Sequence, residues 1–168
     1  LLQAFDQARV KGSLAQADAV ALVRTWLAYE SRRSFHVLLP GLFAAERERR
    51  YVMASDLRIP VGNGVVIHAH LVRPRGGKGA GQRLPALLRF TLDPAQDDAQ
   101  RGAVAGYVGT TAYVRGRTPD GQGEVRPFVH DGEDAVAVIE WIARQPWSDG
   151  RVAMLGGGYS GYTAWAAA

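Results

Sequence analysis

The stretch Val152-Ala153-Met154-Leu155-Gly156-Gly157-Gly158-Tyr159-Ser160-Gly161 decides the fold class of this chain. An apolar run followed by three consecutive glycines predicts a short strand over residues 152–155 and then a tight turn. The apolar residues that follow predict a last helix from about Gly161. A strand that leads through a glycine-rich turn into a helix is typical of α/β proteins, in which functional residues gather at the carboxyl ends of the strands.

The residues before this stretch alternate between strand and helix patterns, which supports the same fold class. Period-two alternation predicts a hairpin of two strands, 51–59 and 65–72, around a turn at Val61–Gly64. Two further apolar runs predict strands at 85–92 and 108–114, and helices are predicted at 97–105 and 131–144. This order predicts an α/β fold, with a mostly parallel sheet and helices on both faces.

Residues 1–50 read as a helical leader. The pattern predicts one short helix over residues 1–10 and a longer second helix that a capping box of Ser13 and Gln16 begins. Pro40-Gly41 is expected to break the run before a third helix over about 42–50. An apolar stripe on the second helix is expected to pack in a core and comprises Leu22, Trp26 and Tyr29.

Composition excludes several classes of protein. The chain has 168 residues, a usual size for one domain, and no cysteine, which excludes disulfide scaffolds, cysteine-ligated metal sites and a cysteine nucleophile. Its 20 basic and 16 acidic residues are interspersed, so no nucleic-acid-binding face is expected. No apolar run is long enough for a membrane span. Because proteins without cysteine work in either redox setting, the composition leaves the compartment open.

The glycine-rich turn itself admits two kinds of chemistry. Gly156, Gly158 and Gly161 match the G-x-G-x-x-G pattern, in which the backbone approaches a dinucleotide pyrophosphate at a helix N-terminus. The other candidate is a nucleophile elbow, where a catalytic residue stands on a strained turn and needs a small residue two positions before it. From these residues alone, both interpretations stay open.

The preceding segments resemble one family closely. Asp131–Asp134, Ile139–Ile142, Gln145–Val152 and Gly156–Gly161 are similar to the X-Pro dipeptidyl-peptidase and cocaine-esterase family of α/β-hydrolases. The resemblance extends over about residues 51–168. It implies that the chain forms the N-terminal half of an α/β-hydrolase sheet, truncated after the elbow. The family that it resembles consists of serine hydrolases that cleave esters, amides or X-Pro peptides. The resemblance also implies no metal or organic cofactor.

When this sequence is aligned with the family's elbow, it departs from the family's pattern at two positions. The nucleophile position is Gly158, which has no side chain, and Tyr159 supplies the backbone N–H of an oxyanion hole. Asp93 stands where the family's oxyanion tyrosine is expected. The acid and the histidine of a catalytic triad are expected beyond the elbow. The resemblance therefore predicts an inactive member whose old cleft holds an ester, amide or peptide substrate, or another ligand.

Alternatives remain beside this prediction. Ser160 could serve as a shifted nucleophile, although a hydroxyl in the first turn of a helix is the expected role. Gly158 could be an engineered replacement of serine, and the three glycines could belong to a dinucleotide-binding module. Both termini look cut, so the strand at 152–155 is expected to expose an edge that self-associates or pairs with the rest of the domain.

Two histidine groups are expected to be structural. His68 and His70 face the same side of a strand, but no third metal ligand is identifiable in the sequence. His130 lies beside Asp131, which is expected to cap the following helix.

Overall fold

The computed structural model describes residues 13–76, 82–93, 97–118 and 120–168. The chain divides between Arg47 and Glu48 into two compact units, and each is described by itself. The helix expected over residues 1–10 lies outside the described residues.

Two helices precede the sheet, and they differ from the sequence-based expectation. They are α2 (Gln16–Phe35) and α3 (Leu39–Arg50). Ala15 is the N-cap of α2 and no side chain caps it, so the expected capping box is absent. Pro40 lies in the first turn of α3, where a missing N–H costs nothing, so it does not break the run.

The expectation of core packing for the stripe on α2 is also wrong, since neither helix contains a buried residue.

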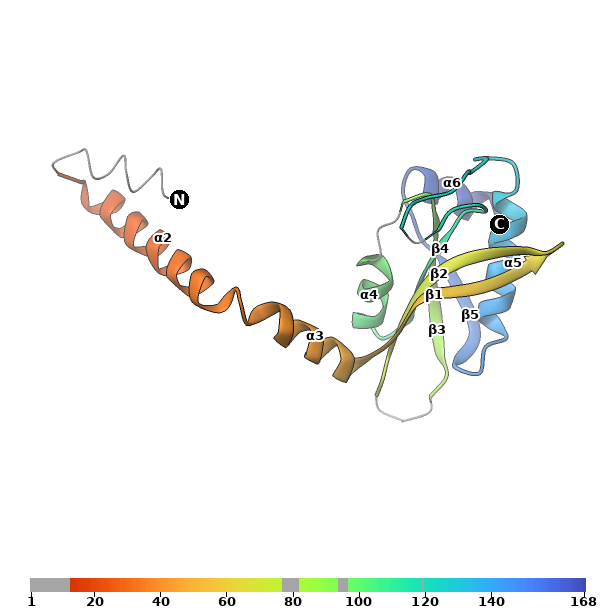
Figure 1. The fold of residues 1–168 in the computed structure, drawn as a ribbon, viewed down its shortest axis with the longest axis horizontal. Helices are drawn as coiled ribbons and strands as arrows, with labels where there is room; N and C mark the ends of the chain where they lie inside the picture. Colours follow the sequence, from red (N-terminus) through yellow and green to blue (C-terminus); the bar gives the residue numbers. More distant parts are fainter. Residues whose placement is uncertain (1–12, 77–81, 94–96, 119) are drawn as a thin grey trace. The chain divides into compact units, whose positions relative to one another are not determined.

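The second unit is built on one five-stranded sheet (Figure 1). In chain order its strands are β1 (Tyr51–Gly62), β2 (Val65–Pro74), β3 (Leu84–Thr91), β4 (Val108–Tyr113) and β5 (Ser148–Met154). The spatial order is β1-β2-β4-β3-β5, with β1 and β4 antiparallel to β2, and β4 and β5 parallel to β3. The expected α/β class is confirmed, but the sheet is mixed rather than mostly parallel, because the β1–β2 hairpin joins β4 in antiparallel pairing. The parallel half of the sheet carries the candidate site.

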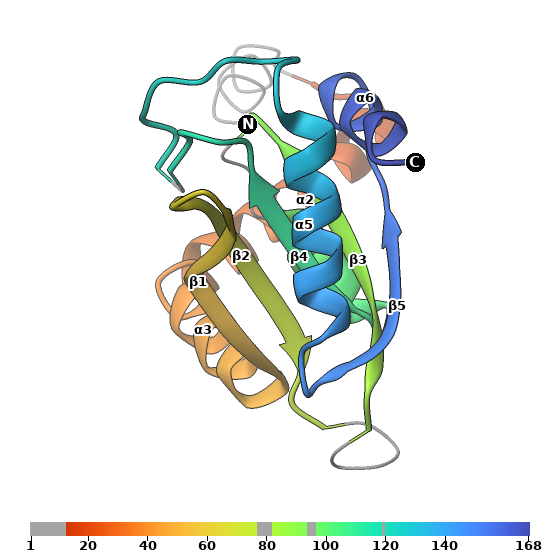
Figure 2. The same cartoon turned by 90° about the vertical axis from the view of Figure 1, so that its right-hand side faces the viewer.

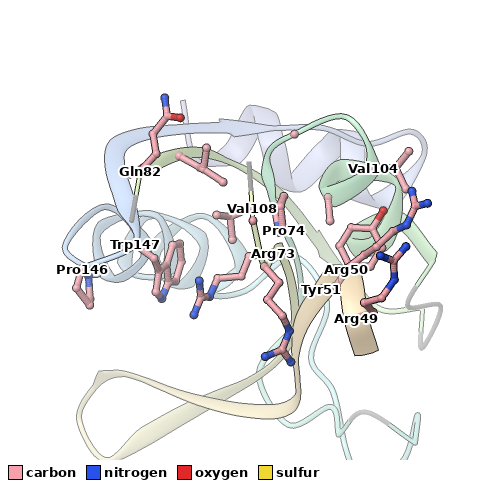
Figure 3. Close-up of a pocket in the computed structure, with 15 residues that line it drawn as sticks. Arg49, Arg50, Tyr51, Arg73, Pro74, Gln82, Val104, Val108, Pro146 and Trp147 are labelled. Atoms are coloured by element: carbon pink, nitrogen blue, oxygen red, sulfur yellow. The ribbon is translucent and has the colours of Figure 1, made fainter. Parts of the chain in front are cut away.

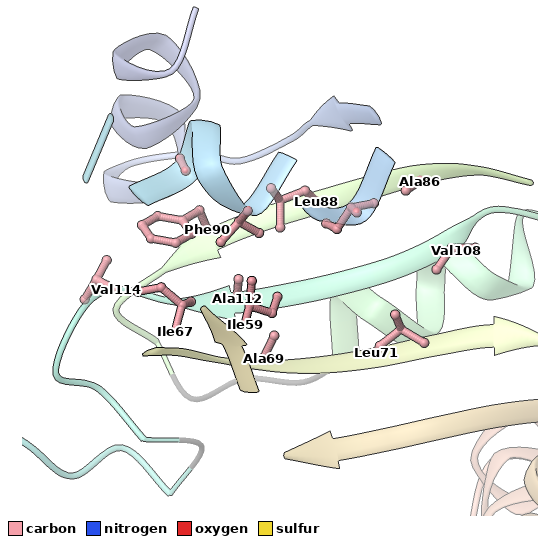
Figure 4. Packing of buried hydrophobic residues seen from close by; sticks show 13 residues of the cluster. Ile59, Ile67, Ala69, Leu71, Ala86, Leu88, Phe90, Val108, Ala112 and Val114 are labelled. Carbon is pink, nitrogen blue, oxygen red and sulfur yellow. The ribbon is translucent and has the colours of Figure 1, made fainter. Parts of the chain in front are cut away.

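Helices cover both faces of this sheet, as expected. Helix α4 (Asp97–Val104) packs on β4, β2 and β3, while α5 (Asp131–Ala143) and α6 (Tyr159–Ala166) pack against each other and the sheet. Figure 2 shows α5 lying along the face of the sheet. The main core lies between α5 and the sheet, and Figure 4 shows Leu88 and Phe90 of β3 at its centre. Burial of these large apolar side chains is the main stabilising term of the unit.

Two element boundaries near the glycine-rich turn differ from the prediction. β5 begins at Ser148, four residues before the expected start, because Ser148 pairs with Leu84 ahead of a register irregularity. Helix α6 begins at Tyr159 rather than Gly161, so the turn is tighter than expected. As expected, β5 is an edge strand in the sheet as described. In the described part of the chain, the helices are too short or too polar to cross a membrane.

Candidate active site

The turn between β5 and α6 has an unusual backbone conformation at Gly158. This residue has φ 58° and ψ −126° and is the N-cap of α6. That combination is strained for a residue with a Cβ and costs glycine little, which agrees with the strained turn expected of an elbow. A Cβ built on Gly158 would meet no atom within 4 Å, so open space lies where a side chain would project.

Gly156, two residues earlier, has the opposite surroundings. A Cβ there would lie 2.4 Å from Cβ of Ser160 and 2.5 Å from its carbonyl carbon. Helix α6 therefore turns back directly over Gly156, and only glycine fits. This is the tight strand-to-helix turn that an elbow needs.

Ser160, the alternative nucleophile, lies in the first turn of α6 and is 1% exposed. Its Oγ accepts a hydrogen bond of 3.1 Å from Nε of Arg89, which extends from β3. A buried hydroxyl that a guanidinium engages has no open path to a substrate, and this weighs against the shifted-nucleophile alternative.

Arg89 also connects the loop after β3 to the site. Its Nη1 forms an ion pair with Asp98 of α4, and its Nη2 lies 3.3 Å from Oδ2 of Asp93. The backbone N–H of Asp93 donates to Oγ1 of Thr91 (3.0 Å), and its side chain is 65% exposed. The Asp93 carboxylate and the Ser160 hydroxyl thus contact one guanidinium, which offsets part of the negative charge beside the elbow.

Tyr159, whose backbone N–H is the expected oxyanion donor, is anchored through its side chain. Its hydroxyl donates to Oδ2 of Asp131 at 2.6 Å, and the same oxygen accepts from the backbone N–H of Phe128 at 2.7 Å. Burial, with this hydrogen bond, raises the pKa of the Tyr159 hydroxyl well above its usual value, so it stays a donor. Being first in the helix, the N–H of Tyr159 has no partner within α6.

The role expected for Asp131 is therefore wrong. His130 is the N-cap of α5 and no side chain caps that helix, because the buried Asp131 carboxylate serves Tyr159 and Phe128 instead. The sequence did contain a signal for these contacts, because Asp131 and Asp134 lie on the otherwise apolar, buried face of α5. A buried carboxylate needs hydrogen-bond donors.

The second of these carboxylates, Asp134, holds the loop after β4. Arg115 donates Nε (3.0 Å) and Nη2 (2.7 Å) to the two oxygens of Asp134, which is 2% exposed. Arg117 then donates Nε to the backbone carbonyl of Leu92 at 3.0 Å. The loops after β3 and β4 and the start of α5 are thus tied together at the carboxyl edge of the sheet.

The histidines take structural positions. Nδ1 of His68 lies 2.6 Å from Oδ1 of Asp56, and His70 is buried at 6% exposed. Nδ1 of His130 lies 3.9 Å from Glu133, not in a pair with Asp131. Among the described residues, no three metal-ligating side chains come together.

Comparison with known proteins identifies relatives of this chain. A model of the X-Pro dipeptidyl-peptidase (S15) family matches residues 63–168. Two proteins from Mycobacterium bovis and Mycobacterium tuberculosis, both named "Putative serine esterase", are 30% identical over 121 residues. The match covers 67% of this chain and 19% of theirs, so the chain spans about a fifth of their length.

Solved structures show the same fold. A CocE/NonD family hydrolase from Staphylococcus aureus has a TM-score of 0.57 at 19% identity, covering 70% of this chain and 25% of its own. An esterase from Pyrobaculum calidifontis has a TM-score of 0.52 at 23% identity, covering 81% of this chain and 45% of its own. At these identities the likeness shows the fold, which is that of the α/β-hydrolases.

Proposed function

Because the chain belongs to the X-Pro dipeptidyl-peptidase (S15) family of serine hydrolases, we propose that its elbow binds an ester, amide or peptide carbonyl without cleaving it. The observation that carries this proposal is Gly158. It has the backbone conformation of a nucleophile elbow and free space in front of it, but no oxygen to attack a carbonyl. Without an attacking oxygen, no acyl-enzyme forms at this turn.

Parts of a binding site for the carbonyl remain. The N–H of Tyr159 lies at the N-terminus of α6, where the helix dipole favours a carbonyl or carboxylate oxygen. Asp93, at the position proposed for the oxyanion tyrosine, supplies a carboxylate where a donor is needed. Its ion pair with Arg89 reduces its repulsion of a ligand oxygen but does not make it a hydrogen-bond donor. The N–H of Tyr159 can therefore still hold a carbonyl oxygen, while the carboxylate of Asp93 opposes the extra negative charge of a developing oxyanion.

The alternatives fit these observations less well. Ser160 is buried and hydrogen-bonded to Arg89, which does not suit a nucleophile. Gly156 is required by the close approach of α6, which accounts for it without a bound pyrophosphate. The hairpin at one side of the sheet and the order β1-β2-β4-β3-β5 differ from the order 3-2-1-4-5-6 of dinucleotide-binding sheets.

The proposal is tested by turnover and by binding with the same compounds. We expect the purified protein to leave a p-nitrophenyl ester and an X-Pro p-nitroanilide intact over hours, while both raise its melting temperature at millimolar concentration. Absorbance at the p-nitrophenol and p-nitroaniline wavelengths reports cleavage, and a thermal melt reports binding. Turnover that survives purification and disappears in Ser160→Ala would refute the proposal and establish Ser160 as the nucleophile.

A further inference from the structure

A pocket of about 820 Å³ lies at the end of the parallel strands that is opposite the elbow. Its lining includes Leu84 and Val108, the first residues of β3 and β4, and Trp147, which directly precedes β5. These positions are the amino ends of the parallel strands, whereas Gly158 follows the carboxyl end of β5. The pocket therefore belongs to neither the elbow nor its neighbouring loops, and its residues all lie in the second unit.

Guanidinium groups from two segments meet in this pocket. The segments are the end of α3 and the end of β2, and the four residues are Arg49, Arg50, Arg73 and Arg75. Antiparallel pairing of Tyr51 with Pro74 brings the two segments together. Figure 3 shows Arg73 between Trp147 on one side and Arg49, Arg50 and Tyr51 on the other. The sequence predicted no basic cluster, because these arginines gather only through strand pairing.

Backbone contacts, not acidic side chains, fix one of these arginines. The N–H of Arg75 donates to the carbonyl of Arg50 (2.7 Å), and its Nε donates to the carbonyl of Glu48 (3.0 Å). Over the described residues, neither Arg73 nor Arg75 forms an ion pair with a carboxylate, and the described lining contains no Asp or Glu. Arg73 and Arg75 thus bring positive charge into the pocket that an anion would offset.

The shape and the remaining lining indicate what kind of anion fits. Arginine presents a planar fork of donors that matches the oxygens of a phosphate group. Tyr51 and Trp147, both partly exposed, add flat apolar surface beside the charge. A volume of this size suits a small organic ligand. We propose that this pocket binds the phosphate group of a small organic phosphate of about nucleotide size.

Titration with defined probes tests the proposed ligand chemistry. We expect pyrophosphate and ADP to bind saturably by calorimetry, and adenosine, which lacks phosphate, to bind at least about tenfold more weakly. Affinity for both phosphates should fall as salt is raised. Vesicles containing phosphatidic acid, compared with phosphatidylcholine alone, show whether a lipid headgroup supplies the same phosphate chemistry.

Matched variants locate the site. Arg73→Gln and Arg75→Gln should each weaken binding of these phosphates by about tenfold or more. Arg73→Lys keeps the positive charge but loses the planar fork of donors, so its affinity for these phosphates should lie between that of Arg73→Gln and that of the unaltered protein. Arg126→Gln changes the same charge on a side chain that is 80% exposed outside the pocket, and should bind normally. Thermal melts confirm that each variant is folded.

Each result decides the proposal. The proposal is supported if pyrophosphate, ADP or phosphatidic acid vesicles bind, and if Arg73→Gln or Arg73→Lys weakens that binding while Arg126→Gln leaves it unchanged. Binding of the vesicles would assign the phosphate group to a lipid. Absence of saturable binding to all three, or equal weakening in Arg126→Gln, overturns it. Because this pocket is remote from the elbow, either result leaves the proposed function of the elbow unaffected.

Discussion

Gly156→Ala is expected to lower the free energy of unfolding by about 3 kcal/mol. The added methyl group would stand 2.4 Å from Cβ of Ser160 and 2.7 Å from its backbone oxygen. Relief requires movement of the first turn of α6, because backbone atoms cannot rotate away as a flexible side chain can. Chemical denaturation followed by circular dichroism measures the loss.

The neighbouring glycine provides the control for this prediction. A Cβ on Gly157 would meet no atom within 4 Å and its φ is not positive, so Gly157→Ala should change stability by less than about 1 kcal/mol. Equal losses in the two variants would show that α6 does not pack over Gly156 as described. The pair therefore tests the geometry of the turn separately from any activity.

Arg115→Met is expected to cost about 3 kcal/mol of stability. It removes both hydrogen bonds to Asp134 and leaves a carboxylate that is 2% exposed without its charge partner. Loss of a partner is severe for a buried charge, since water cannot replace the lost contacts. The same denaturation measurement applies, and the loop after β4 should become more susceptible to proteolysis than in the unaltered protein.

Arg144→Met is the matched control because Arg144 also pairs with a carboxylate of α5. Its Nη2 lies 2.8 Å from Glu140, but the two side chains are 71% and 62% exposed. An exposed pair of this kind contributes little, so a loss below about 1 kcal/mol is expected. If Arg144→Met were as damaging as Arg115→Met, burial of Asp134 would not be the cause.

The regular elements of the second unit were largely predictable from sequence. Continuous apolar runs at β3 and β4 and the Asn63-Gly64 turn, with φ 49° and 73°, carry local signals that tertiary packing reinforces. The start of β5 was missed because Ser148-Asp149-Gly150 has the composition of a turn. Pairing of Ser148 with Leu84 overrides that local preference.

The contacts around the candidate site were not predictable in the same way. Tyr159 and Asp131 are 28 residues apart, and Arg89 and Ser160 are 71 apart, so no local pattern predicts either pair. The partial signals were polar residues in buried patterns: Arg89 within an apolar strand, and Asp131 and Asp134 on the apolar face of α5. A buried charge needs a partner, but the sequence does not say which residue supplies it.

The backbone conformation of Gly158 is a different case, because the family resemblance indicated a strained turn at this position. A strained turn tolerates glycine at no cost, whereas a serine there costs about 1–2 kcal/mol. If Gly158 holds the nucleophile position, glycine there avoids this strain and leaves the turn intact. Gly158 accordingly adopts, without that cost, a backbone conformation that agrees with the proposed elbow.

Fluorophosphonate labelling of the unaltered protein, Gly158→Ser and Gly157→Ser, read by intact mass and peptide mapping, tests the account most directly. If Gly158 holds the nucleophile position, the unaltered protein and Gly157→Ser stay unlabelled, and Gly158→Ser gains a phosphonyl group at position 158. Labelling there should be weak because the histidine that would activate a serine is expected beyond the elbow and because Asp93 replaces a donor, and Asp93→Tyr added to Gly158→Ser should strengthen it. An adduct on Ser160 of the unaltered protein, absent from Ser160→Ala, would contradict the account.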